Sequence, residues 1–139
     1  MSDTLTWLLT KNDSSFIVRR NGVEFSREKY NLTNLNTHKY SGLAAVKGVD
    51  VSLNDKKVYM TTKVAKRSNK PSKAYRTVPM NRCAKAVSKS MCNTLKKSYY
   101  RGDLKYAAVA RWCRLNRLAK VEKGVVKAAL SKKPRSQRA

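Results

Sequence analysis

The sequence predicts an α+β fold: a small antiparallel β-sheet with a short N-terminal helix, then a basic loop and two C-terminal α-helices with a basic tail. Apolar residues alternate on either side of turn-forming residues twice between residues 15 and 60. After residue 81 they recur every three or four positions, as on one face of a helix. Positive charge is concentrated in the second half of the chain. A chain of 139 residues fits one compact domain with extensions.

The first element, residues 3 to 10, has two interpretations. Leu5, Leu8 and Leu9 suit one turn of a helix, whereas Leu5, Trp7 and Leu9 suit a strand, so periodicity leaves both open. We place Trp7 in the core, together with Trp112.

A hairpin follows at residues 15–26. Asn21-Gly22 tolerates the positive φ that a type I′ turn requires, and apolar residues flank it on both sides. A two-residue loop pairs Val18 with Phe25 and Arg19 with Glu24, so that an apolar pair and an opposite-charge pair both form.

A second hairpin is predicted at residues 49–60. Val49, Val51 and Leu53 alternate before a four-residue loop at 54–57, and Val58 and Met60 alternate after it. The preceding residues 42–48 begin and end with glycine but lack Gly-Lys-Ser/Thr, so we predict a strand at 43–46 and not a phosphate-binding loop.

The remaining chain is predicted to be an exposed basic loop followed by two helices. We place the sheet body at 1–62, the loop at 63–79, the helical part at 80–122 and the basic tail at 123–139, which should be disordered until it binds. In the first helix, residues 81–99, one apolar face carries Ala84, Val87, Met91 and Leu95. In the second, the apolar residues are Leu104, Ala108, Trp112, Leu115 and Leu118. Asp103 is predicted to cap this second helix and also to pair with Arg101.

The charge distribution indicates an anionic, extended partner. Net charge is +24, and residues 1–55 hold 7 Lys/Arg and 6 Asp/Glu, whereas residues 56–139 hold 25 and 2. Such a chain repels itself unless a polyanion surrounds it, and the asymmetry favours nucleic acid.

Other classes of function find little support. Acid–base or nucleophilic catalysis needs positioned carboxylates, His or Cys, but the chain has one His, His38, and two acids after residue 55. Cys83, Cys92 and Cys113 show no metal-ligand spacing and are interpreted as reduced intracellular thiols. There is no membrane-spanning run and no secretory signal. We therefore expect no enzyme activity, cofactor, metal, small-molecule substrate or membrane partner.

The candidate RNA-contacting residues are basic or aromatic side chains in polar surroundings. Lys supplies point charge, Arg adds bidentate contacts, and Tyr can stack on unpaired bases. The candidates are Arg19, Arg20, Lys39, Tyr40, Lys63, Lys66, Arg67, Lys70, Lys73, Tyr75, Arg76, Lys85, Lys89 and Arg101.

Several segments occur in the order found in one known family. They are Leu5-Thr6-Trp7, residues 14–21, residues 39–43, Lys70-Pro71, Tyr75-Arg76-Thr77 and residues 99–108. With the length and charge, they make the chain resemble the eukaryotic large-subunit ribosomal protein twenty-eight family, of the L28e type, over roughly residues 1–120. Asp13 and residues 121–139 depart from the family pattern.

The resemblance implies a structural protein of the cytosolic 60S subunit, assembled via the nucleolus and bound to large-subunit ribosomal RNA and neighbouring ribosomal proteins. It also favours a helix at residues 3–10. Two alternatives share the charge: a dissociable nucleolar large-subunit assembly factor or RNA chaperone, and a histone-like DNA-binding protein. Nucleolar factors with a related N-terminal domain usually continue into a long acidic region, which this chain lacks.

Overall fold

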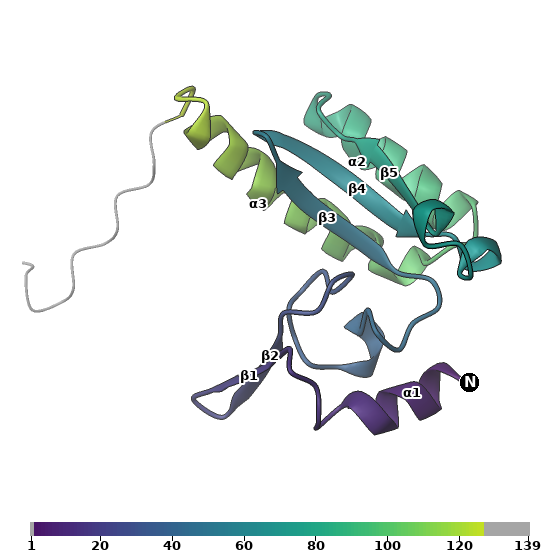
Figure 1. The fold of residues 1–139 in the computed structure, drawn as a ribbon. Coiled ribbons are helices and arrows are strands. Elements are labelled where there is room, and N and C mark those ends of the chain that lie inside the picture. Colours follow the sequence, from purple (N-terminus) through teal and green to yellow (C-terminus); the bar gives the residue numbers. More distant parts are fainter. Residues whose placement is uncertain (1, 127–139) are drawn as a thin grey trace, which may run out of the picture.

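The structure, a computed structural model, describes residues 2–126 and has the predicted α+β architecture (Figure 1). From residue 127 onward, the predicted basic tail lies outside the described residues. In chain order the elements are α1 (Asp3–Thr10), β1 (Ile17–Arg20), β2 (Val23–Ser26), η1 (His38–Tyr40), β3 (Val49–Asn54), β4 (Lys57–Lys63), η2 (Ala65–Arg67), η3 (Pro71–Lys73), β5 (Tyr75–Pro79), α2 (Ala84–Cys92), η4 (Asn93–Lys97), η5 (Gly102–Leu104) and α3 (Lys105–Glu122).

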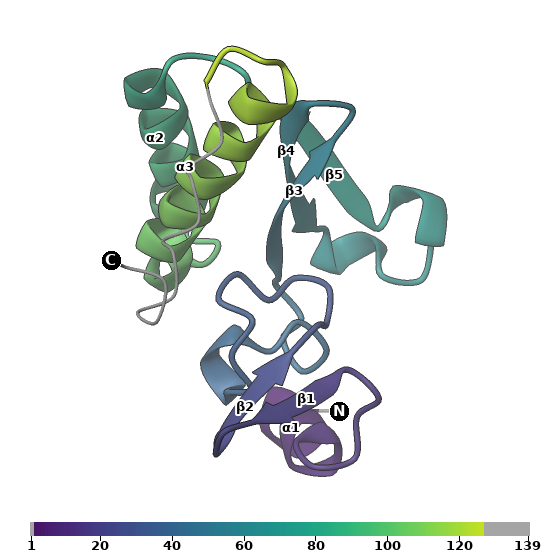
Figure 2. The ribbon, with the colours of Figure 1, turned by 90° about the vertical axis from the view of Figure 1, so that its left-hand side faces the viewer.

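The first element is the helix α1. The Ser2 side chain caps it by accepting a hydrogen bond from the backbone N–H of Leu5 at 3.3 Å. Its apolar face stays outside the main core, and Leu9 is 62% exposed. Trp7, predicted as a core residue, is instead half-buried beside His38, with ring centroids 5.9 Å apart. The prediction was wrong because α1 lies with the β1–β2 hairpin, below the three-stranded sheet (Figure 2).

β1 and β2 form the first hairpin in the predicted register. Val18 pairs with Phe25, and Arg19 pairs with Glu24. The Arg19 Nε donates to Glu24 Oε1 at 2.8 Å. Asn21-Gly22 adopts positive φ at both positions, 49° and 75°, as a type I′ turn requires.

β3, β4 and β5 form an antiparallel sheet in that order. Val51 pairs with Met60 as predicted, but the connecting loop is shorter than predicted, because Asn54 pairs with Lys57. Asp55-Lys56 is left as a two-residue turn with φ of 48° and 59°. Positive φ at both positions matches the twist of the flanking strands, which is why the four-residue loop does not form.

Two segments differ from their predicted conformation. Residues 75–79, assigned to the basic loop, form the edge strand β5, which pairs with residues 59–63 of β4. An edge strand accommodates Pro79 and needs no apolar alternation of its own. Residues 43–46, predicted as a strand, form a turn in which the Ala44 N–H donates to Ser41 Oγ at 3.3 Å. Such local bonds compete with strand pairing.

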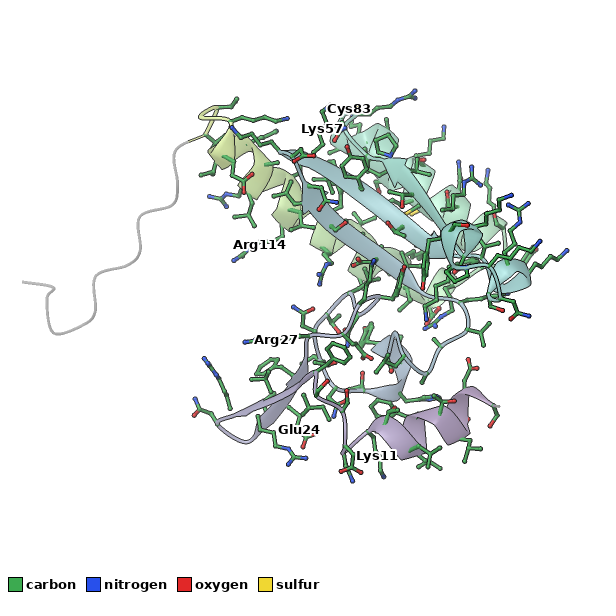
Figure 3. The ribbon with its side chains drawn as sticks, in the orientation of Figure 1. Lys11, Glu24, Arg27, Lys57, Cys83 and Arg114 are labelled. Carbon is green, nitrogen blue, oxygen red and sulfur yellow. The ribbon has the colours of Figure 1, made fainter. Side chains whose placement is uncertain are left out.

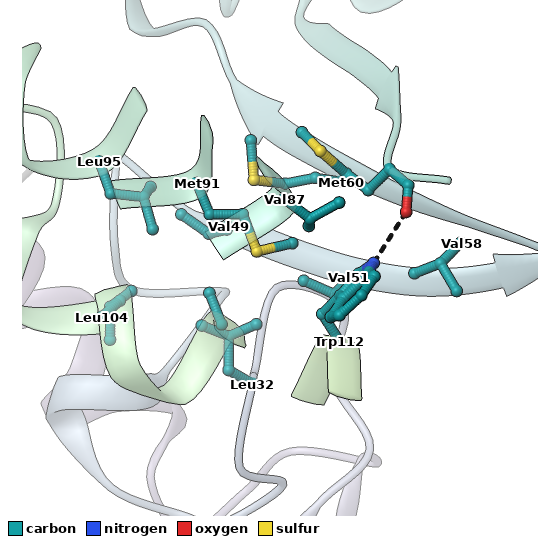
Figure 4. Close-up of a cluster of buried hydrophobic side chains, with 12 residues drawn as sticks. Leu32, Val49, Val51, Val58, Met60, Val87, Met91, Leu95, Leu104 and Trp112 are labelled. Atoms are coloured by element: carbon teal, nitrogen blue, oxygen red, sulfur yellow. Dashed lines mark hydrogen bonds between the residues drawn. The ribbon is translucent and has the colours of Figure 1, made fainter. Parts of the chain in front are cut away.

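α2 and α3 cover one face of the three-stranded sheet (Figure 2). Side chains from β3 and β4, among them Val49 and Met60, meet Met91, Leu95 and Trp112 from the helical layer (Figure 4). Trp112 is 2% exposed, as predicted for a core residue, and its Nε1 donates to the Met80 carbonyl oxygen at 2.9 Å. Satisfying the indole N–H allows this large ring to be buried without leaving an unpaired donor.

The first C-terminal helix follows the predicted apolar spacing with changed ends. α2 begins at Ala84, which is exposed, and continues into the π-helical turn η4, so that Val87, Met91 and Leu95 are buried on one face. The spacing therefore located the buried face although it did not locate the helix ends.

In α3 the prediction for Asp103 is half right. A 3₁₀ turn precedes the helix and moves its N-cap to Leu104, so Asp103 does not cap it. The other part of the prediction is confirmed, because Asp103 pairs with Arg101 at 2.9 Å. At the far end of α3, Leu118 is 45% exposed and Ala119 is buried in its place.

A guanidinium group joins α3 to two distant segments. Arg111 Nε donates to the Val51 carbonyl oxygen at 3.0 Å. Its Nη1 donates to the carbonyl oxygens of Asn31 and Leu32, at 3.2 and 3.1 Å, and to Asn34 Oδ1 at 3.1 Å. Arg111 therefore holds together the helical layer, the sheet and the loop that leads away from the first hairpin.

Candidate nucleic-acid interface

Residues 64–74, here called the basic segment, join β4 to β5 through the turns η2 and η3. The Val64 N–H donates to the Ala74 carbonyl oxygen at 2.8 Å and closes the segment at its base. Pro71 occupies the start of η3, where its fixed φ suits the turn. These turns present four exposed side chains from an ordered backbone, namely those of Lys66, Arg67, Lys70 and Lys73.

The charges of the basic segment have no carboxylate partners in the described part of the chain. Two ion pairs are present between residues 2 and 126, Arg19–Glu24 and Arg101–Asp103. Nitrogen-tipped side chains extend into solvent around η2 and η3 (Figure 3). Solvated faces usually mix both signs of charge, so a surface of one sign creates a field that attracts polyanions.

Tyr75 follows the basic segment and provides an exposed aromatic surface. The residue is 51% exposed, and its ring stacks on the buried residue Tyr30, with ring centroids 5.6 Å apart and an interplanar angle of 17°. Lys29 Nζ lies 5.7 Å from the centroid of each ring, within cation–π distance. Burial raises the pKa of Tyr30 to about 12. The stack therefore holds Tyr75 in place while leaving much of its ring accessible.

A groove lies between the basic segment, the N-terminal helix and the 43–46 turn. It has a volume of about 350 Å³, and its lining includes Asp3 and Thr6 of α1, the Ala44–Ala45 backbone turn, Ala65 and Tyr75. Asp3 Oδ2 accepts a hydrogen bond from the Val46 N–H at 3.4 Å, which connects α1 to the turn. The groove thus has an aromatic side chain and a carboxylate among its lining.

Other predicted contact residues lie on separate exposed surfaces. Lys85 and Lys89 are exposed on α2, and Arg76 is exposed on β5. Arg19 and Arg20 are exposed on the β1–β2 hairpin, on the opposite side of the molecule from η2 and η3 in Figure 1. The structure therefore distributes the exposed bases over at least two surfaces and does not gather them into one patch.

Lys63 uses its charge inside the protein. Its Nζ donates to the carbonyl oxygens of Gly42 and Ala45, and it lies 5.0 Å from the centroid of the Tyr30 ring. Burial lowers the pKa of Lys63, although attraction by Glu28 opposes the shift. The contact of Lys63 with RNA stays a prediction, whereas its hydrogen bonds to the 42–45 turn are present in the structure.

Arg101 is also bonded within the protein. Its Nη2 donates to the Lys39 carbonyl oxygen at 2.8 Å, and its Nη1 donates to that of Lys47 at 3.2 Å. The guanidinium bonds both oxygens of Asp103 and holds the pKa of that carboxyl below its usual range. Tyr40 packs against the core. For Arg101, Tyr40 and the exposed Lys39, contact with RNA stays a prediction.

Lys29 was not singled out by sequence reasoning. Its contact with Tyr75 depends on the approach of two segments that are distant in the sequence. The adjacent pair Lys29-Tyr30 has the same basic–aromatic pattern as Lys39-Tyr40, which was selected, and that signal could have found it. Tyr99, 91% exposed, is a further aromatic side chain open to solvent.

Residues 2–126 contain no group of three or more His, Cys, Asp or Glu side chains close enough to hold a metal ion. Cys83, Cys92 and Cys113 are free thiols. In the same part of the chain, none of the helices combines the length and the apolar character that crossing a membrane requires.

The fold and this surface define a class: small, strongly basic α+β proteins whose exposed lysines and arginines greatly outnumber their acidic partners. More particularly, the chain belongs to the Ribosomal L28e protein family, whose family model matches residues 5–118. The resemblance inferred from the sequence is confirmed. The family is one of ribosomal proteins and not of enzymes.

Relatives named large ribosomal subunit protein eL28 match much of the chain. The protein of Dictyostelium discoideum is 30% identical over 132 residues, covering 95% of this chain and 97% of that protein. The protein of Schizosaccharomyces pombe is 32% identical over 117 residues, covering 80% and 87%. For Caenorhabditis elegans the identity is 40% over 84 residues, which span 59% of this chain and 65% of that protein.

Proposed function

We propose that the protein is a structural constituent of the large subunit of the cytosolic ribosome, assembled via the nucleolus, where it binds and bridges ribosomal RNA. Membership of the L28e family and the names of the relatives support the large subunit. The observation that carries RNA binding is the basic segment, whose exposed side chains have no carboxylate partner between residues 2 and 126. Phosphate contacts dominate such binding.

The bridging role follows from the separation of the exposed bases. The basic segment lies on one side of the molecule, and Arg19 and Arg20 lie on the hairpin at the other side (Figure 1). Two RNA segments, or one segment and a neighbouring ribosomal protein, are the partners that this arrangement suits.

Charge-neutralising variants test whether the basic segment binds RNA. In the first variant Lys66, Arg67, Lys70 and Lys73 are each replaced by Gln. In the matched control Lys56, Lys57, Lys120 and Lys123, which are also exposed, are replaced by Gln. If all four side chains of the segment neutralise phosphates, the slope of log affinity for ribosomal RNA against log salt should fall by about 3 in the first variant. Equal losses in both variants would mean that net charge, and not this surface, governs binding.

Sedimentation separates a structural protein from a dissociable factor. In a sucrose gradient at high salt, we expect the protein to migrate with mature large subunits and translating polysomes. Release by salt, or confinement to precursor particles, would favour an assembly factor. Competition with duplex DNA provides a second check, because displacement of ribosomal RNA at equal phosphate concentration would support the histone-like alternative.

A further inference from the structure

The groove beside Tyr75 is the right size for a small part of a larger ligand. Its volume of about 350 Å³ is at the lower end of the range of about 300 to 1,000 Å³ found for small-molecule sites. Chain segments from three parts of the sequence form it: α1, the 43–46 turn and the basic segment with Tyr75. On a protein that binds RNA, a pocket of this size suits one nucleotide.

An aromatic side chain that is already held by stacking lines the groove. Tyr75 lines it, and Tyr30 stacks on the Tyr75 ring in a nearly parallel arrangement, with an interplanar angle of 17°. Lys29 approaches both rings. A stacked ring offers its remaining face to a planar ligand at little entropic cost, because its orientation is already held.

The charges in the groove favour a base over a phosphate. Lys63 lines the groove, but its ammonium group is bonded to the Gly42 and Ala45 carbonyl oxygens. Asp3 places a carboxylate in the lining, which repels a phosphate. Along the basic segment, by contrast, the groove-lining residues Ala65, Ser68 and Ala74 are interspersed with exposed lysines and an arginine. Cations outside a recess that has a carboxylate in its lining match a nucleotide whose phosphates stay outside while its base enters.

We infer that the groove holds one unpaired base of RNA, stacked on Tyr75, while Lys66, Arg67, Lys70 and Lys73 hold the flanking phosphates. The inference rests on the proposed RNA-binding function and adds the part of the RNA that this site recognises: a single-stranded or extruded nucleotide and not a paired one. Proteins recognise such bases in RNA by stacking them on aromatic side chains.

The test compares two probes that differ only in their bases: a short oligoadenylate, and an abasic strand with the same number of phosphates. The full chain should prefer the oligoadenylate by about 5- to 150-fold, the range expected for stacking of one base. Tyr75→Ala should lose this preference, whereas Tyr75→Phe should keep it. Because stacking is not a phosphate contact, Tyr75→Ala should leave the salt slope unchanged.

A second variant protects the test against misfolding, because Tyr75 also packs on Tyr30. Ala65→Leu narrows the groove at another lining residue without removing an aromatic ring or a charge, and it should also abolish the preference. Tyr99→Ala and Ala110→Leu, at exposed sites outside the groove lining, should retain it. Equal affinity of the wild-type chain for the two strands, or a preference that survives both groove variants, would overturn the inference. Either result leaves phosphate-driven binding in place, whereas loss of binding to ribosomal RNA itself would contradict the proposed function.

Discussion

Replacing Arg111 with Lys tests whether one guanidinium joins the two parts of the fold. Arg111 donates to the carbonyl oxygens of Val51, Asn31 and Leu32 and to the side chain of Asn34, at 3.0 to 3.2 Å. A lysine ammonium is a single point donor on a flexible stem, so it can reach only part of this set. Arg111→Lys preserves the net charge, which separates an effect on stability from an effect on RNA binding.

The expected loss follows from the bonds that lysine cannot make. We take two of the four bonds as lost, and a hydrogen bond to a charged group contributes about 1.5 to 3 kcal/mol. Because Arg111 is half-buried, we discount the sum to about 2 to 4 kcal/mol of unfolding free energy. At an m value of about 2 kcal/mol/M, the urea midpoint should fall by about 1 to 2 M.

Urea unfolding monitored by tryptophan fluorescence measures this loss, because Trp112 is buried in the core. Arg114→Lys is the matched control. Arg114 is exposed on the same helix (Figure 3), so the substitution should change the stability by less than about 0.5 kcal/mol. If Arg111→Lys unfolds at the wild-type midpoint, then Arg111 does not stabilise the contact between α3 and the loop at 31–34.

Three further predictions follow from particular contacts. In Gly42→Ala the new Cβ would lie 1.9 Å from the Lys29 carbonyl oxygen, so urea unfolding should show a loss of about 3 kcal/mol or more, and wild-type stability would contradict the packing. In Tyr30→Phe a buried hydroxyl without a hydrogen-bond partner among residues 2–126 is removed, so stability at pH 7 should rise by about 1 kcal/mol or more. Burial raises the pKa of Tyr30 from 10.0 to about 12. Between these two pH values Tyr30 ionises in the unfolded chain but not in the folded one, so wild-type stability falls as the pH rises and the advantage of Tyr30→Phe should widen. Arg101 holds the pKa of Asp103 below its usual 3.8, so the stability that the Asp103 carboxylate contributes is present above that pH and disappears at lower pH. Asp103→Asn should therefore be less stable than wild type at pH 7 and equal to it in strong acid. A difference that persists in acid would exclude this cause.

The hairpins were predictable because local rules determine them. Asn21-Gly22 specifies the turn, and the turn specifies which residues of β1 and β2 face each other. The edge strand β5 was missed because its conformation comes from pairing with β4, and its own composition of bases, Thr and Pro indicates a loop. The position of Trp7 was missed for a related reason, since an apolar side chain in a sequence does not reveal whether its element packs on the core.

The candidate interface was predictable in composition and not in detail. An excess of bases over acids ensures that many lysines and arginines stay unpaired, whatever the fold. Lys63 could not be distinguished from Lys66 in the sequence, because its bonds go to backbone carbonyls of distant residues. For Arg101 the pairing with Asp103 was predicted, but its bonds to the Lys39 and Lys47 carbonyls were not. Backbone acceptors have no sequence signature, so only the three-dimensional structure separates a lysine that stabilises the fold from one that is open to a ligand.

The long-range bonds from the C-terminal part determine when the fold can be completed during synthesis. Arg111 donates hydrogen bonds to the loop at 31–34 and to Val51 of β3, and the Tyr100 hydroxyl donates to the Gly48 and Lys63 carbonyl oxygens. The N-terminal residues leave the ribosome first, at a translation rate of about 5 to 20 residues per second. Their hydrogen bonds to Tyr100 and Arg111 can form only after those two residues have been made. A nascent chain released before Arg111 has been made would lack the contacts that close the structure, so the contacts between the N-terminal half and α3 form only after residue 111 has been made.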